Sequence, residues 1–228
     1  MSLKSFDFGV IGAGIVGLAM ANRIREIHPE ATIVVFDKED SIGLHASGRN
    51  SGVLHAGFYY SPDTLKAQLT RDGNQMLRDF CAQEGIAVKA TGKVVVTQNE
   101  SQISALKELH QRGNANGVFT ELISAEQLAD FEPLARTTQV ALWSPNTAVA
   151  NPLAVTKALA TKVEREGTVL KLGQKVTKVM DRQIITDAGD YAIGHVINTA
   201  GLYADKVAKQ FGFCDDYVML PFKGLYWY

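Results

Sequence analysis

The chain has 228 residues, of which 46% are hydrophobic and 21% charged, which is typical of a globular protein and excludes a disordered or fibrous one. Its 23 lysines and arginines balance 24 aspartates and glutamates, so no basic surface for binding nucleic acid or an anionic membrane is expected. Cys81 and Cys214 have no metal-ligand or redox spacing, and we expect both to be buried hydrophobic residues in a reducing compartment.

The N-terminal residues predict a βαβ unit. Residues 6–11 are typical of a buried strand, apolar residues recur at helical spacing over 15–27, and residues 32–36 form a β-branched strand. Two strands joined by a crossover helix indicate a parallel sheet. The apolar run at 8–21 resembles a secretory signal, an interpretation that its regularly spaced glycines and the following strand exclude.

The next segments predict a long functional loop and then a helix. Residues 41–57 contain four glycines and two histidines without a clear period, and long irregular segments inside domains are usually functional. A helix is expected over 62–81, with Leu65, Leu69, Met76, Leu77 and Phe80 on its apolar positions.

The remainder predicts alternating strands and helices, including a mixed α/β insertion and a meander over 169–187. Strands are expected at 93–97, 118–123, 195–199 and 218–228, and helices at 103–110, from 125, at 151–165 and at 204–211.

The strongest motif is the glycine series Gly12, Gly14 and Gly17, which follows a strand and opens a helix. Gly12 permits a tight turn, Gly14 lets backbone approach a pyrophosphate, and Gly17 allows close packing of helix on strand. Asp37 ends the next strand, 20 residues beyond Gly17, where its carboxylate would bind the adenosine ribose. The motif predicts a dinucleotide site.

NAD and FAD both use this unit, and the later segments decide between them. A nicotinamide dehydrogenase usually continues with further βα units, whereas here the 41–57 segment intervenes. Residues 198–201 (Asn-Thr-Ala-Gly) follow a later strand and offer either a second close approach to a cofactor or an ordinary strand end.

Three segments carry a resemblance to a known family. Residues 47–60 (SGRNSGVLHAGFYY) with Leu65-Lys66-Ala67, residues 198–205 (NTAGLYAD) and residues 221–224 (PFKG) resemble the L-2-hydroxyglutarate dehydrogenase/oxidase family of D-amino-acid-oxidase-like flavoenzymes. The resemblance implies an α/β fold, with a Rossmann-like FAD-binding domain at 1–80 and 150–213 and a partial, mixed α+β substrate domain at 81–149 and 214–228. Family members continue further, so we expect a chain truncated at its C-terminus.

The resemblance also implies non-covalent FAD and its contacts. The expected cofactor-binding residues are Gly12, Gly14, Ile15, Val16, Gly17, Asp37, Lys38, Ser47, Arg49, Asn50, Ser51, Gly52, Val176, Ala200 and Gly201.

His55 is the candidate general base, because an imidazole is largely neutral at neutral pH and can accept the substrate's hydroxyl proton. The alternative is a loop histidine bonded to backbone. Lys66, Lys223 and Arg49 are candidates for binding substrate carboxylates, although most lysines are simply solvated. Tyr59 and Tyr60 would bind substrate or, alternatively, pack. The remaining histidines lack metal-ligand spacing, so no metal is expected.

The sequence therefore predicts FAD-dependent oxidation of a small 2-hydroxy acid, L-2-hydroxyglutarate to 2-oxoglutarate, with oxygen or a quinone as electron acceptor. A flavin-linked glycerol-3-phosphate dehydrogenase is the alternative enzyme, and a catalytically silent FAD-binding module is the alternative class. A cytoplasmic location, with peripheral attachment at the inner face of a membrane, is the expectation for either enzyme.

Overall fold

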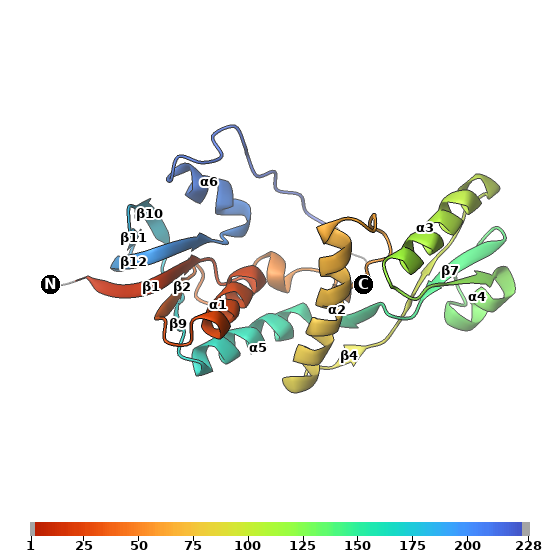
Figure 1. The fold of residues 1–228 in the computed structure, drawn as a ribbon, viewed down its shortest axis with the longest axis horizontal. Coiled ribbons are helices and arrows are strands. Elements are labelled where there is room, and N and C mark those ends of the chain that lie inside the picture. Colours follow the sequence, from red (N-terminus) through yellow and green to blue (C-terminus); the bar gives the residue numbers. More distant parts are fainter. Residues whose placement is uncertain (1–2, 225–228) are drawn as a thin grey trace. The chain divides into compact units, whose positions relative to one another are not determined.

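A computed structural model describes residues 3–224 and divides the chain into two compact units (Figure 1). The first unit comprises Met1–Ser51 and Pro152–Tyr228, and the second comprises Gly52–Asn151. The first unit is therefore discontinuous in sequence. Residues 52–80 and 150–151 of the predicted FAD-binding domain lie in the second unit, and residues 214–224 of the predicted substrate domain lie in the first.

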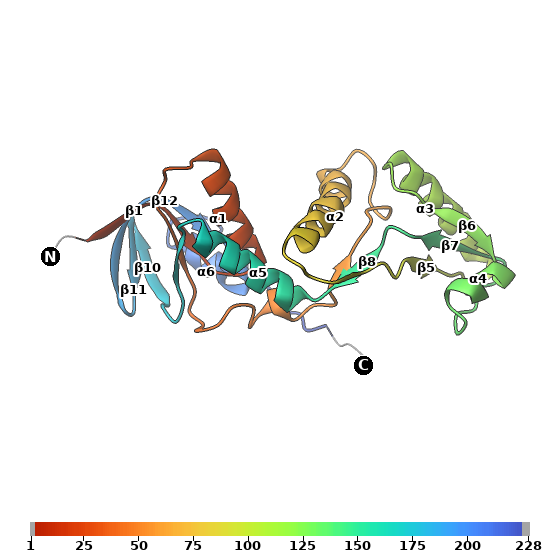
Figure 2. The same ribbon diagram turned by 90° about the horizontal axis from the view of Figure 1, so that it is seen from below.

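The first unit contains a six-stranded sheet in the order β10-β11-β12-β1-β2-β9. β1 is parallel to both β12 and β2, and β2 is parallel to β9, so the predicted parallel βαβ arrangement is confirmed. β10, β11 and β12 form an antiparallel meander, which Figure 2 shows at the edge of the sheet. The meander predicted over 169–187 is therefore correct only in part, because β9 at its start pairs in parallel with β2 and β12 provides the third antiparallel strand. The elements are β1 Lys4–Ile11, α1 Ile15–Ile27, β2 Ile33–Phe36, a 3-10 helix Ala46–Gly48, α5 Pro152–Arg165, β9 Val169–Lys171, β10 Val176–Met180, β11 Gln183–Thr186, β12 Gly189–Asn198, a 3-10 helix Gly201–Tyr203 and α6 Ala204–Lys209.

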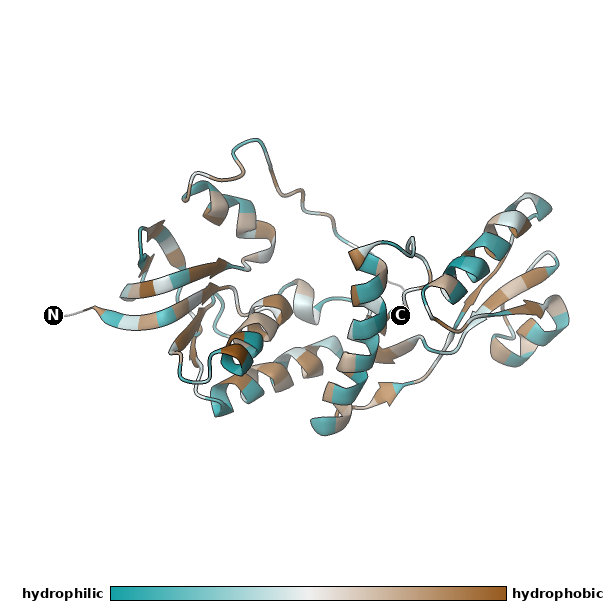
Figure 3. Ribbon diagram, viewed as in Figure 1, coloured by the Kyte–Doolittle hydropathy of each residue, from teal (hydrophilic) through white to brown (hydrophobic). Residues whose placement is uncertain are grey.

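Apolar strands form the core of this unit. All four residues of β2 (Ile-Val-Val-Phe) are buried, and Figure 3 shows this strand as hydrophobic. Val10 of β1 and Ile193 of β12 are also buried. α1 packs against β1, β2 and α5 and buries Leu18 and Ile24 on its inner face. The loops at the carboxyl ends of the strands therefore extend from a packed layer of strands and helices.

The second unit contains two small antiparallel sheets, β3-β8-β4 and β5-β7-β6. Phe58, Leu106 and Leu142 form its main buried cluster, and Ile123 and Leu128 form a smaller one. The elements are β3 Val53–Leu54, α2 Leu65–Gln83, β4 Val88–Lys89, β5 Lys93–Val95, a 3-10 helix Glu100–Gln102, α3 Ile103–Ala115, β6 Glu121–Ser124, α4 Ala125–Phe131, β7 Val140–Ser144 and β8 Ala148–Ala150.

The predicted apolar positions of α2 are wrong in part, because three of the five are exposed while Leu77 and Phe80 are half-buried. Leu65, Leu69 and Met76 are 72%, 68% and 71% exposed, whereas Ala67 and Cys81 are buried. Asn74 and Arg78 lie toward the same side as these buried residues and donate hydrogen bonds to backbone carbonyls. The side of α2 that faces the rest of the unit therefore includes the polar residues Asn74 and Arg78 and excludes Leu65, Leu69 and Met76.

Two further expectations are wrong. Residues 218–224 form no strand and are exposed, and the rest of the expected strand lies outside the described residues. A strand needs a neighbour to pair its backbone, and no described segment provides one. Cys81 is buried, and burial raises the pKa of its thiol, but Cys214 is exposed.

Among residues 3–224, no helix is long and apolar enough to cross a membrane.

Candidate functional site

The carboxyl ends of β1 and β12 bring together two segments that are far apart in the sequence. Ile11 pairs with Asn198, so the chain leaves both parallel strands at the same edge of the sheet. The Thr199 hydroxyl donates to the backbone oxygens of Ile11 at 2.9 Å and Gly12 at 3.1 Å. In open α/β sheets, ligands bind outside the carboxyl ends of strands, where this junction lies.

Two glycines of this loop, Gly12 and Gly17, occupy positions that admit no side chain. Gly12 has φ of 108°, and a Cβ atom there would lie 2.4 Å from the Thr199 carbonyl oxygen. A Cβ atom on Gly17 would lie 1.9 Å from the Gly12 oxygen, so α1 touches the loop at this point. Gly14 occupies the N-cap of α1 and has no side chain to cover the helix N-terminus. The result is a cradle of backbone at the positive end of a helix dipole.

The Asp37 carboxylate is tied to this cradle by two backbone amides. Its Oδ2 accepts a hydrogen bond from Ala13 N–H at 2.8 Å, and its Oδ1 accepts one from Glu39 N–H at 3.0 Å. Asp37 is half-buried at the end of β2. Each carboxylate oxygen has two lone pairs, so the group keeps acceptor capacity for a ribose hydroxyl.

The 47–52 loop contacts the start of α1. Ser47 Oγ accepts a hydrogen bond from Ile15 N–H at 2.9 Å, which places a hydroxyl at the helix N-terminus. Asn50 Nδ2 donates to the backbone oxygens of Ala46 and Ser47 and holds the turn. Arg49 and Ser51 are exposed, and Gly52 has φ of 69° and belongs to the second unit.

The other predicted cofactor residues of the first unit lie around this edge or beside the core. Val16 is 63% exposed at the start of α1, and Ala200 lies next to Gly12. Lys38 is paired with Glu39, and its ammonium lies 5.0 Å from the centre of the Tyr203 ring. Gly201, with φ of 55°, begins a 3-10 helix. Val176 packs its side chain against the sheet core.

His55 lies in the second unit, between the buried residues Leu54 and Ala56. Within residues 3–224 its ring forms no hydrogen bond, whereas its backbone oxygen accepts one from Asn74 Nδ2 at 3.2 Å. Partial burial, and to a smaller degree the positive charge of Lys93, lower the pKa of His55 below its ordinary value of 6.5. The imidazole is therefore neutral at neutral pH and free to accept a proton.

The predicted substrate residues have packing contacts of their own. The Lys66 ammonium lies 4.5 Å from the centre of the Tyr60 ring, and Lys93 lies 4.7 Å from that of Tyr59, which also stacks on Phe58. Lys223 is exposed in the segment after α6. Within residues 3–224, no cluster of three His, Cys, Asp or Glu residues is arranged to hold a metal ion.

Sequence reasoning missed three residues that shape these surroundings. The sequence indicated Thr199 only as part of a turn of small residues. Its hydroxyl bonds to Ile11 and Gly12, which are almost 190 positions away in the sequence, could not be predicted. Lys93 and Asn74 act on His55 from β5 and α2. The one available signal was the pair of polar residues, Asn74 and Arg78, four positions apart in an otherwise amphipathic helix.

Together, the glycine cradle, the paired strand ends and the Asp37 carboxylate define the first unit as a dinucleotide-binding unit, and its residues fit FAD. A family model described as FAD dependent oxidoreductase matches residues 7–228. The chain therefore belongs to this family, whose cofactor is FAD.

Several relatives share one name. The L-2-hydroxyglutarate dehydrogenase of Indibacter alkaliphilus is 36% identical over 228 residues, covering 97% of this chain and 57% of the relative. The protein of that name from Escherichia coli strain K12 is 32% identical, covering 97% and 53%. The mitochondrial one of Homo sapiens is 32% identical, covering 99% and 52%. The chain thus spans about half the length of these relatives.

Solved structures share the fold. L-proline dehydrogenase from P. horikoshii matches with a TM-score of 0.83 at 21% identity, covering 93% of this chain and 57% of that one. L-alpha-glycerophosphate oxidase from Mycoplasma pneumoniae, solved with FAD bound, matches with a TM-score of 0.82 at 23% identity, covering 91% and 57%. These similarities establish the architecture, in agreement with the predicted Rossmann-like α/β class.

Proposed function

We propose that the protein takes part in the FAD-dependent oxidation of L-2-hydroxyglutarate to 2-oxoglutarate. The observation that carries the oxidoreductase class is the backbone cradle beside Asp37 in a chain of the FAD-dependent family. The choice of substrate rests on the relatives at 32–36% identity that bear this name. The predicted acceptor for the electrons, oxygen or a quinone, belongs to the same proposal.

The proposal assigns FAD to the first unit together with the 47–52 loop. The α1 N-terminus and the amides near Gly14 would face the pyrophosphate, and Ser47 Oγ would help to shape that position. Asp37 would bind the adenosine ribose. The cofactor role of Lys38, Arg49, Asn50, Ser51, Gly52, Val176, Ala200 and Gly201 stays a prediction, as does the domain division at 80/81, 149/150 and 213/214.

FAD, when bound, would supply the acceptor for the hydride that leaves the hydroxyl-bearing carbon of the substrate. We assign the hydroxyl proton to an imidazole ring nitrogen of His55. Its free ring and lowered pKa support this role, because a base must be unprotonated before it can accept a proton. The carbonyl of the product forms as the C–H and O–H bonds break.

Positive side chains would bind the two substrate carboxylates. Lys66 is exposed at the first turn of α2, and Lys223 is exposed in the segment after α6. The Lys66 ammonium lies over the Tyr60 ring and the Lys93 ammonium lies over the Tyr59 ring, so both pairs form cation–π contacts. This arrangement supports Tyr59 and Tyr60 as residues that orient cations, in addition to any direct contact with substrate.

Anaerobic rapid mixing of the FAD-loaded protein with L-2-hydroxyglutarate tests the proposal. Bleaching of the flavin by this acid, and not by its D enantiomer, is the expected result. Bleaching by glycerol 3-phosphate alone would favour the alternative dehydrogenase. FAD that stays oxidised with all three compounds would favour a module that binds FAD without turnover.

The predicted cytoplasmic location with peripheral membrane attachment is part of the same proposal. Co-sedimentation with lipid vesicles tests it, and recovery of the protein in the supernatant would contradict the attachment.

A further inference from the structure

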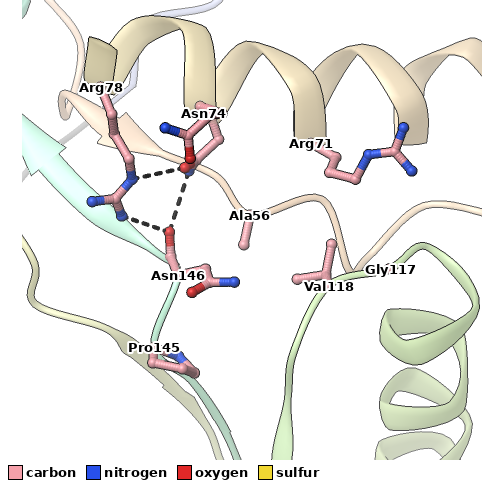
Figure 4. Close-up of a pocket in the computed structure, with 9 residues that line it drawn as sticks. Ala56, Arg71, Asn74, Arg78, Gly117, Val118, Pro145 and Asn146 are labelled. Carbon is pink, nitrogen blue, oxygen red and sulfur yellow. Dashed lines mark hydrogen bonds between the residues drawn. The ribbon is translucent and has the colours of Figure 1, made fainter.

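A cavity of about 360 Å³ lies within the second unit, beside the His55 loop (Figure 4). α2 forms one wall, and residues from three other segments complete it. The α2 side contributes Arg71, Asn74, Gln75 and Arg78, and the remaining lining residues are Ala56, Gly117, Val118, Pro145 and Asn146. The lining therefore contains two arginines and no acidic residue.

Hydrogen bonds to protein oxygens hold the Arg78 guanidinium in place. Its Nε donates to Asn74 Oδ1 at 2.9 Å and its Nη2 donates to the backbone oxygen of Asn146 at 2.8 Å. A guanidinium has five N–H donors, so these two bonds leave three. Within residues 3–224, no carboxylate forms an ion pair with Arg78.

Arg71 lies two helical turns from Arg78 on the same side of α2, as Figure 4 shows. Its Nη1 donates to the Asn116 backbone oxygen at 3.2 Å, and its Nε pairs with Asp72 at 2.8 Å. Because Asp72 is half exposed, its charge is screened by water and offsets that of Arg71 only in part. The cavity keeps an excess of positive charge.

We propose that this cavity binds a small organic carboxylate. The planar fork of Arg78 matches a carboxylate in two parallel hydrogen bonds, and Arg71 adds a second positive charge. Ala56, Val118 and Pro145 offer apolar surface for the carbon skeleton of the ligand. The volume is near the lower end of the range for ligand sites, roughly 300–1,000 Å³, and selects a small acid.

The ligand would act on the His55 loop through Asn74. Asn74 Nδ2 donates to the backbone oxygens of Leu54, His55 and Asn146, while its Oδ1 accepts from Arg78. The Arg78 guanidinium fixes the orientation of the Asn74 amide, so a carboxylate bound to Arg78 would be linked to Asn74 through this guanidinium. Binding of the ligand should therefore reduce local unfolding of the backbone at residues 54–56.

Calorimetric titration of the whole chain with succinate tests the site, with neutral succinamide as the matched probe. We expect succinate to bind and succinamide not to bind, and Arg78→Gln to weaken succinate binding by at least about tenfold. Arg71→Gln provides a second variant. Within residues 3–224, the only long-range hydrogen bond of Arg71 is the one to Asn116, so this variant keeps the Asn74 contacts. It should weaken binding in the same direction.

Arg136→Gln is the control, because Arg136 lies in the same unit and bonds to the backbone oxygens of Pro133 and Ala135, away from the cavity. It should bind succinate as the unmodified chain does. Lys66→Gln removes a proposed substrate residue and shows whether succinate binds there instead of in the cavity. Hydrogen exchange at residues 54–56 should slow with succinate.

Unchanged affinity in both Arg71→Gln and Arg78→Gln, or equal binding of succinamide, would overturn the proposal. Loss of binding in Lys66→Gln alone would place the acid at the proposed substrate residues and would also overturn it. The readout is binding and not turnover, so failure of the proposed oxidation would leave this test intact.

Discussion

The backbone amide of Ala13 donates a 2.8 Å hydrogen bond to Asp37 Oδ2, joining the glycine loop after β1 to the carboxylate after β2. Asp37 thus has two roles, since the group expected to bind the ribose also holds the loop expected to bind the pyrophosphate. Loss of the carboxylate should disturb both.

Asp37→Ala should lower the affinity for FAD by about tenfold or more, because a hydrogen bond to a charged group contributes roughly 1.5–3 kcal/mol. The measurement is the dissociation constant from titration of FAD fluorescence. Asp40→Ala is the matched control, because Asp40 is an exposed neighbour whose carboxylate accepts a hydrogen bond from the adjacent Ser41 hydroxyl. Equal affinities in both variants would refute the role of Asp37.

Gly17→Ala should destabilise the first unit by about 1–3 kcal/mol or more, because its Cβ atom would lie 1.9 Å from the Gly12 oxygen. Gly73→Ala is the control, because a Cβ atom there meets no heavy atom within 4 Å and Gly73 lies inside α2. It should stabilise the protein by about 0.5–1 kcal/mol. Urea unfolding gives both free energies, and a harmless Gly17→Ala would mean that the loop and helix are not in contact.

His55→Asn should slow flavin reduction by substrate at least about a hundredfold while FAD binding stays unchanged, because a positioned base contributes about 10²–10⁴-fold. Rapid mixing measures the rate. A variant that bleaches as fast as the unmodified protein would reduce His55 to a structural loop residue. Its backbone bond to Asn74 does not depend on the side chain, so the loop itself should survive the change.

The pH dependence of flavin reduction should reflect the lowered pKa of His55. Because the neutral ring is the active form, activity should fall only as the pH drops below the ordinary histidine value of about 6.5. Lys93→Gln removes a positive charge that opposes protonation, so the pKa should rise and the acidic limb should move to higher pH. The shift should be partial, since burial is the larger cause. A shift to lower pH would contradict the assignment.

The exposed residues Leu65, Leu69 and Met76 of α2 should promote self-association, because they lie on one side of the helix and present apolar side chains to water. Leu69→Gln combined with Met76→Gln should raise the monomer fraction in sedimentation without lowering the free energy of unfolding. Leu142→Gln, at a fully buried position, should instead destabilise the second unit. An unchanged monomer fraction in the α2 variant would show that another surface mediates association.

The sequence predicted the first βαβ unit well, because the glycine series, the helical period and the β-branched strand all lie within 37 residues. The helix starting at Pro152 was likewise predicted from Asn151-Pro152. The contact of Thr199 with Gly12 depends on the pairing of β12 with β1, which local patterns do not encode. The prediction for α2 was incomplete for another reason. The Asn74 and Arg78 side chains donate hydrogen bonds to backbone oxygens, and hydrophobic periodicity does not detect such bonds.

Direct titration of FAD into the 228-residue chain, followed by the change in flavin fluorescence, tests the central claim that the first unit is an FAD site. We expect saturable binding of one FAD per chain, with NAD unable to displace it. Binding of NAD in preference to FAD, or FAD binding that Gly17→Ala and Asp37→Ala both leave intact, would contradict it.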